Sequence, residues 1–174
     1  MLKESIRASK LYDSIICVGG GFSQGHLKDA DVFEKYDEMD RKNFKSALLA
    51  AHFATHQLNN KGFVAFTGAA AAFNGPVEHA VTYGISKCAT HSLAMTLALR
   101  SEIPADSCVV TLLPSILDTE ANRKAMPDAD MKEWIDPKKL AETVFHWAAG
   151  VHRPLNGSFI SISYKNNTIV PNFM

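Results

Sequence analysis

The sequence lacks the features that mark membrane proteins, nucleic-acid-binding proteins and secreted proteins. No run approaches the roughly 20 apolar residues that span a bilayer, and 18 basic side chains are balanced by 18 acidic ones. Because no basic stripe is present, attraction to nucleic acid is not indicated. The start, MLKESIRASK, is amphipathic rather than a signal peptide. These absences favour a cytoplasmic protein with a small neutral partner.

Cysteine and metal-ligand patterns are equally sparse. The three cysteines, Cys17, Cys88 and Cys108, form no C-x-x-C pair, so we expect reduced core residues rather than disulfides or a zinc site. His52 and His56 have the spacing of a helical zinc pair, but Phe53 stands where a metalloprotease needs its glutamate. Two packing or interface histidines are the simpler interpretation. The sequence predicts no metal site.

Apolar runs alternate with helical stretches along the whole chain. We expect strands near 14–18, 63–67, 108–113 and 158–163, and helices near 32–58, 82–101 and 137–149. This alternation is typical of an α/β domain, and continuous apolar strands suit a parallel sheet covered on both faces. A hairpin with Asn166 and Asn167 at its tip is expected at the end. The 174 residues therefore predict one α/β domain.

A glycine cluster follows the first predicted strand. The dinucleotide-binding pattern G-x-G-x-x-G fails, because after Gly19 and Gly21 the third glycine would fall on Gln24. No second strand with a ribose-binding acid follows either. We interpret the cluster as a turn that permits close backbone approach, with a phosphate cradle as the alternative.

Tyr83 and Lys87 are four residues apart on the second long helix. They share a helical face, so the lysine can favour the ionised phenol and make it a proton-exchanging group. The alternative is a surface tyrosine stacked on a lysine stem. Asn43, on the first long helix, reads alone as an ordinary exposed amide.

Four segments, DSIICVGGGF, TYGISK, TLLPSILDT and NRKAMPDAD, resemble the short-chain dehydrogenase/reductase family, and most closely its pterin-reducing members. The resemblance runs from about Leu11 to the C-terminus. It implies a doubly wound, Rossmann-like parallel sheet. It also implies NADH as hydride donor and a quinonoid dihydropterin as substrate, reduced to the tetrahydropterin, which regenerates tetrahydrobiopterin.

The resemblance also implies roles for single residues. Tyr83 is similar to the family's proton donor, and Lys87 to the group that lowers its pKa and holds the nicotinamide ribose. Asn43 matches the helix asparagine that supports a water-linked proton relay. Ala70 stands where most members place a serine that polarises a carbonyl, and this favours a pterin over an alcohol substrate.

Further cofactor contacts come from loops after strands. The residues implied are Gly19, Gly20 and Gly21 near the adenosine part, and Pro114 and Thr119 near the nicotinamide and phosphates. Ser115 replaces the usual glycine after that proline. The stretch from Asn122 to Pro127 corresponds to a loop that closes over substrate, with a solvated loop and short helix as the alternative.

The family's opening third, with its glycine-rich turn and first three strands, has no counterpart in the sequence. We therefore expect the C-terminal two-thirds of the fold in a truncated form, with weak or absent NADH binding. Ile15 to Val18 should then form an uncovered apolar edge. The resemblance implies a homodimer through the two long helices, so the alternative function is a non-catalytic dimerisation partner of a full-length reductase.

Overall fold

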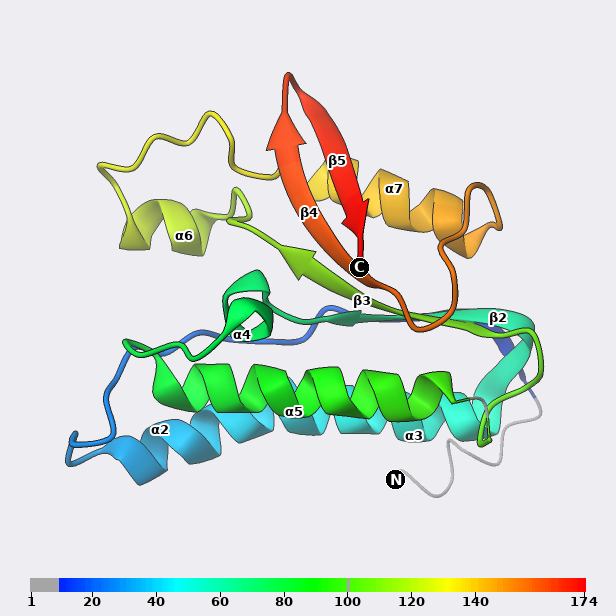
Figure 1. The fold of residues 1–174 in the computed structure, drawn as a ribbon, viewed down its shortest axis with the longest axis horizontal. Coiled ribbons are helices and arrows are strands. Elements are labelled where there is room, and N and C mark those ends of the chain that lie inside the picture. The colour runs from blue at the N-terminus through cyan, green and yellow to red at the C-terminus, as the bar shows by residue number, and fades with distance from the viewer. Residues whose placement is uncertain (1–9, 100) are drawn as a thin grey trace.

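A five-stranded sheet forms the centre of the computed structural model, which describes residues 10–99 and 101–174 (Figure 1). The strands, in spatial order, are β1 (Tyr12–Cys17), β2 (Leu58–Thr67), β3 (Cys108–Pro114), β4 (Phe159–Lys165) and β5 (Thr168–Phe173). The first four are parallel and β5 is antiparallel to β4. This is the predicted α/β fold with a partial doubly wound sheet.

Helices cover both faces of the sheet, as Figure 1 shows. One face carries α2 (Val32–Met39), the π-helical turn η1 (Asp40–Phe44), α3 (Lys45–Gln57) and α5 (Val81–Ala98). The other face carries α7 (Pro137–Ala148). Pro137 starts α7, and the Asp136 carboxylate accepts a hydrogen bond from the N–H of Lys138 at 2.8 Å. No helix in the described ranges is long and apolar enough to cross a membrane.

The core consists of two clusters, one on each face of β2 and β3. Toward α3 and α5, Val64 and Phe66 are fully buried among alanines of α3. Toward α7, Phe63 and Val110 pack with Trp147. Because both faces are covered, these strands read as continuous apolar runs rather than as an alternation.

Most predicted elements are confirmed, with three additions. Residues 59–62, which lie between the expected helix 32–58 and the expected strand 63–67, belong to β2, and Lys61 there has a φ of 59°. Two short helices are further additions: α4 (Ala70–Asn74), which was not predicted, and α6 (Glu120–Ala125), where a short helix was only the alternative to a loop. The terminal hairpin is present, with Asn166 and Asn167 at positive φ as a tight two-residue turn requires.

β1 lies at the edge of the described sheet, but only one of its faces is uncovered. Ile15 and Cys17 pack against the cluster beneath α3, whereas Ile16 and Val18 are 39% and 76% exposed on the α7 side. The expectation of an uncovered apolar edge is confirmed for the described sheet, in which β1 pairs with β2 only. Its two faces differ because successive strand residues face opposite sides. The expectation that all three cysteines are core residues is wrong for Cys88, which is exposed.

Phe66→Ala should lower the free energy of unfolding by about 3–5 kcal/mol, because the Phe66 side chain is fully buried and its removal leaves a cavity in the core. Phe145→Ala, at a position 70% exposed on α7, should cost less than about 0.5 kcal/mol. Urea unfolding followed by circular dichroism compares the two. Equal losses would mean that the assigned core is wrong.

Candidate active site

The N-terminal part of α5, which carries Tyr83 and Lys87, faces the carboxyl ends of β1 and β2. Lys87 is only 4% exposed, and its Nζ donates a hydrogen bond of 2.8 Å to the carbonyl oxygen of Thr67, at the end of β2. The same nitrogen lies 5.9 Å from the ring centroid of Tyr83, one helical turn earlier. The two residues therefore share one face of the helix, as predicted.

The pKa values of this pair differ in part from the expectation. Burial raises the pKa of Tyr83, so the lowering expected from Lys87 is wrong for the protein by itself. The physical reason is placement: the ammonium lies near the ring and is bound to Thr67, away from a direct contact with the phenol. Burial lowers the pKa of Lys87 to about 8, partly opposed by Cys17. Phe22 packs edge-on against the Tyr83 ring at 5.0 Å.

Asn43 is buried, and its side chain holds the glycine loop rather than facing solvent. Its Oδ1 accepts from the N–H of Gly21 at 2.8 Å, and its Nδ2 donates to the Gly21 carbonyl at 3.1 Å. Nδ2 also donates to Ser86 Oγ at 2.9 Å, and Ser86 Oγ donates to the Tyr83 carbonyl at 2.8 Å. The Asn43 side chain thus links the glycine loop to α5, the helix that carries Tyr83.

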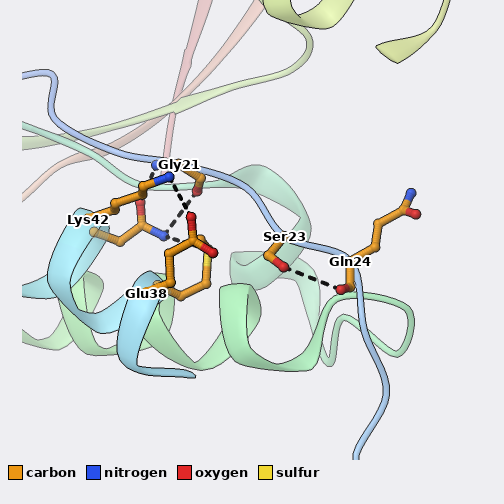
Figure 2. Close-up of polar contacts among 7 residues, drawn as sticks. Gly21, Ser23, Gln24, Glu38 and Lys42 are labelled. Atoms are coloured by element: carbon orange, nitrogen blue, oxygen red, sulfur yellow. Dashed lines mark hydrogen bonds and ion pairs between the residues drawn. The ribbon is translucent and has the colours of Figure 1, made fainter. Parts of the chain in front are cut away.

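The glycine loop lies directly against these side chains. A Cβ atom on Gly20 would lie 3.0 Å from Asn43 Oδ1 and 3.4 Å from Lys87 Nζ. One on Gly21 would lie 2.7 Å from the stem of Lys42, which pairs with Glu38 at 2.6 Å beside the loop (Figure 2). Close packing against the helix therefore explains these glycines. Since the Gly21 N–H is already donated to Asn43, a phosphate cradle at Gly21 is disfavoured.

Pro114 ends β3 and lies on a groove of about 400 Å³ that Thr67, Ile16 and Val18 also line. Thr119 follows outside this groove, where its Oγ1 accepts from the N–H of Asn122 and caps α6. The structure therefore brings Tyr83, Lys87, Asn43 and the glycine loop together and places Pro114 at the adjoining strand end. Thr119 caps α6, and its contact with a cofactor stays a prediction.

The segments flanking these residues are also ordered by local contacts. Ala70 begins α4, with Gly68 and Ala69 between it and the end of β2. Residues 122–125 belong to α6, so the short-helix alternative for this stretch is correct in part. Arg123 there forms an ion pair with Asp118 through two hydrogen bonds.

The sequence analysis missed Ser86, the buried residue of α5 that accepts from Asn43 and donates to the Tyr83 carbonyl. Its position three residues after Tyr83 places it on the same side of the helix.

Similarity to known proteins supports a family assignment. No protein-family model matches the chain. A dihydropteridine reductase from Dictyostelium discoideum is 35% identical over 156 residues, which cover 88% of this chain and 67% of that protein. The chain belongs to the dihydropteridine reductase family. It spans about two thirds of the length of that relative.

Solved structures place the fold among short-chain dehydrogenase/reductases. An enzyme of this family from Serratia marcescens superposes with a TM-score of 0.77 at 23% identity, over 92% of this chain and 68% of that one. BdcA in complex with NADPH superposes with a TM-score of 0.75 at 20% identity, over 92% of this chain and 68% of that one. A Burkholderia cenocepacia short-chain dehydrogenase in complex with NADP superposes with a TM-score of 0.73 at 21% identity, over 92% of this chain and 67% of that one. The chain thus has the fold of these proteins, with a Rossmann-type sheet.

The buried lysine predicts an unusual pH dependence of stability. Because the folded-state pKa of Lys87, about 8, lies below its ordinary value of 10.5, the unfolded chain binds more protons between these values. The free energy of unfolding should therefore rise with pH, by about 1 kcal/mol between pH 8 and 9. Lys87→Met should remove this rise, as measured by urea unfolding at each pH.

The window is limited to pH 9 because burial raises the pKa of Cys17 above its ordinary 9.0, which lowers stability at higher pH. A wild-type curve parallel to that of Lys87→Met across this window would contradict the lowered lysine pKa.

Proposed function

We propose that this chain carries the proton-transfer half of an NADH-dependent reductase that converts a quinonoid dihydropterin to a tetrahydropterin. The observation that carries the proposal is the buried Lys87 beside Tyr83 and the glycine loop, in a chain 35% identical to a dihydropteridine reductase. The product gains two hydrogens: a hydride from the nicotinamide and a proton from the protein.

The residues present fit the nicotinamide end of such a cofactor. Lys87 uses one N–H on Thr67, which leaves two donors for ribose hydroxyls. Gly20 brings its backbone close to Lys87, since a Cβ atom there would lie 3.4 Å from Nζ and 3.0 Å from Asn43 Oδ1. When bound, the cofactor supplies the hydride. Neighbouring structures in complex with NADPH or NADP support a nicotinamide dinucleotide, and NADH is proposed from the family resemblance.

Tyr83 is the proposed proton donor. Its raised pKa keeps the phenol protonated at neutral pH, which is the form a donor needs before transfer. Lys87 is the proposed counter-charge for the phenolate that remains after transfer, with its Nζ 5.9 Å from the centroid of the Tyr83 ring. Ala70 offers no hydroxyl at the end of β2, and this suits an electron-poor quinonoid ring better than a ketone that needs polarisation.

We also propose that two copies pair through α3 and α5. The outer side of α5 presents Ile85, Met95 and Leu99, which are 50%, 52% and 77% exposed. The neighbouring side of α3 presents Leu48 and Leu49 at 44% and 48%. Apolar side chains at this density on two adjacent helices are typical of a helical dimer interface.

A second candidate function rests on the same helices. If the outer faces of α3 and α5 bind a longer reductase subunit, this chain acts as a non-catalytic partner that modulates it. The exposed leucines support this reading. Turnover by this chain alone separates the two functions.

Tyr83→Phe should reduce kcat for a quinonoid dihydropterin by at least about a hundredfold, because it removes the proton donor and little else. The assay follows NADH oxidation at 340 nm with the pterin generated in place. Tyr36→Phe, at a position 42% exposed on α2, is the matched control and should leave kcat unchanged. Turnover retained in Tyr83→Phe contradicts the role of the tyrosine, and no wild-type turnover together with binding to a longer subunit supports the partner function.

Met95→Glu should weaken self-association at least about tenfold, because it places a charge in the centre of the proposed interface. Sedimentation equilibrium over a concentration series measures the change. Phe145→Glu, on the exposed side of α7, should leave the dimer intact. A monomeric wild type, or equal weakening by both variants, would show that α3 and α5 do not form the interface.

A further inference from the structure

One buried group next to the site has no part in the proton transfer described above. His91 lies one helical turn after Lys87 on α5 and is 6% exposed. Its Nε2 accepts a hydrogen bond of 3.2 Å from the backbone N–H of Ala69. Its ring meets Phe159 edge-on at 5.5 Å and Phe73 of α4 at 6.1 Å.

Lys87 and His91 hold the same piece of chain from the same helix. Lys87 donates to the carbonyl of Thr67, and His91 accepts from the N–H of Ala69, two residues further on. Between them, the N–H of Gly68 donates to the Leu112 carbonyl of β3 at 2.8 Å. Three consecutive residues at the end of β2 are therefore fixed by three separate hydrogen bonds.

Gly68 shows how closely the imidazole fits this turn. A Cβ atom there would overlap Nε2 of His91 and would lie 2.8 Å from Cδ2 of Leu113. The turn can pass between the histidine and β3 only without a side chain. Ala70, the first residue of α4, follows directly, so the histidine sets where α4 leaves the sheet.

His91 is in the protonation state that its role as a hydrogen-bond acceptor requires. Burial, and then the charge of Lys87, lower the pKa of His91 to about 4. The imidazole is neutral at physiological pH. Since Nε2 accepts from Ala69, the ring proton is on Nδ1.

We propose that His91 is a positioning residue of the reductase site: by accepting the Ala69 N–H through Nε2, it fixes the turn between Thr67, whose carbonyl binds Lys87, and Ala70, where α4 begins. The inference rests on the proposed reductase function and assigns the site's geometry to a residue outside the proton-transfer pair. A turn free to move by an ångström would displace the Thr67 carbonyl that anchors Lys87, and with it the position of the ammonium relative to Tyr83.

The test compares His91→Phe, which keeps the ring's shape but removes the acceptor, with His91→Gln, whose amide oxygen can reach the same N–H. For His91→Phe we expect kcat/KM for the pterin to fall about tenfold to a hundredfold, with little change in the affinity for NADH. His91→Gln should recover most of the loss. His146→Phe, at an exposed position on α7, is the matched control and should behave as wild type.

A second measurement needs no turnover. Nitrogen-15 NMR should show an unprotonated Nε2 on His91 and slow hydrogen exchange at the Ala69 amide, and His91→Phe should accelerate that exchange. A protonated Nε2, a fast-exchanging Ala69, or an unchanged kcat/KM in a folded His91→Phe would overturn the proposal. Wild-type protein with the NMR signature but no pterin reduction would instead overturn the reductase function, and the positioning role with it.

Discussion

The hydrogen bond from Lys87 to the Thr67 carbonyl is the contact on which the site depends. Burying an ammonium costs free energy, which is why the pKa of Lys87 is lowered to about 8. A backbone carbonyl at a strand end is a fixed acceptor, because its position is set by the sheet. The bond therefore locks α5 in register with β2 and sets where Tyr83 stands. The glycine loop after β1 closes over the same ammonium.

Much of the architecture could be predicted from sequence because its signals are local. Continuous apolar runs mark β2 and β3, and the Asn166–Asn167 turn marks the last hairpin. The π-helical turn at Asn43 has no such signal. Its amide is bound to Gly21 and Ser86, which are 22 and 43 residues away in sequence. Contacts over such separations decide local geometry that periodicity does not record.

The site was predictable in its membership and less so in its electrostatics. A four-residue spacing places Tyr83 and Lys87 on one face, and this was correct. The spacing does not predict the direction of the Lys87 ammonium, which lies toward β2 because it donates to the Thr67 carbonyl there. Desolvation then dominates the tyrosine's pKa. The same spacing continued once more reaches His91, so the helix face itself was the signal for the residue that sequence reasoning left out.

Thr67 connects the chemistry to the open face of the sheet. Its carbonyl binds Lys87, its Oγ1 donates to the Cys17 carbonyl of β1 at 3.0 Å, and its residue lines the apolar groove beneath α7. The exposed side chains of Ile16 and Val18 line that groove as well. Thr67 therefore has three roles at one strand end: it anchors the ammonium, binds the neighbouring strand β1 and lines the groove. A substitution or a ligand in the groove at this residue acts next to the acceptor on which the lysine depends, because only the backbone of Thr67 separates the two.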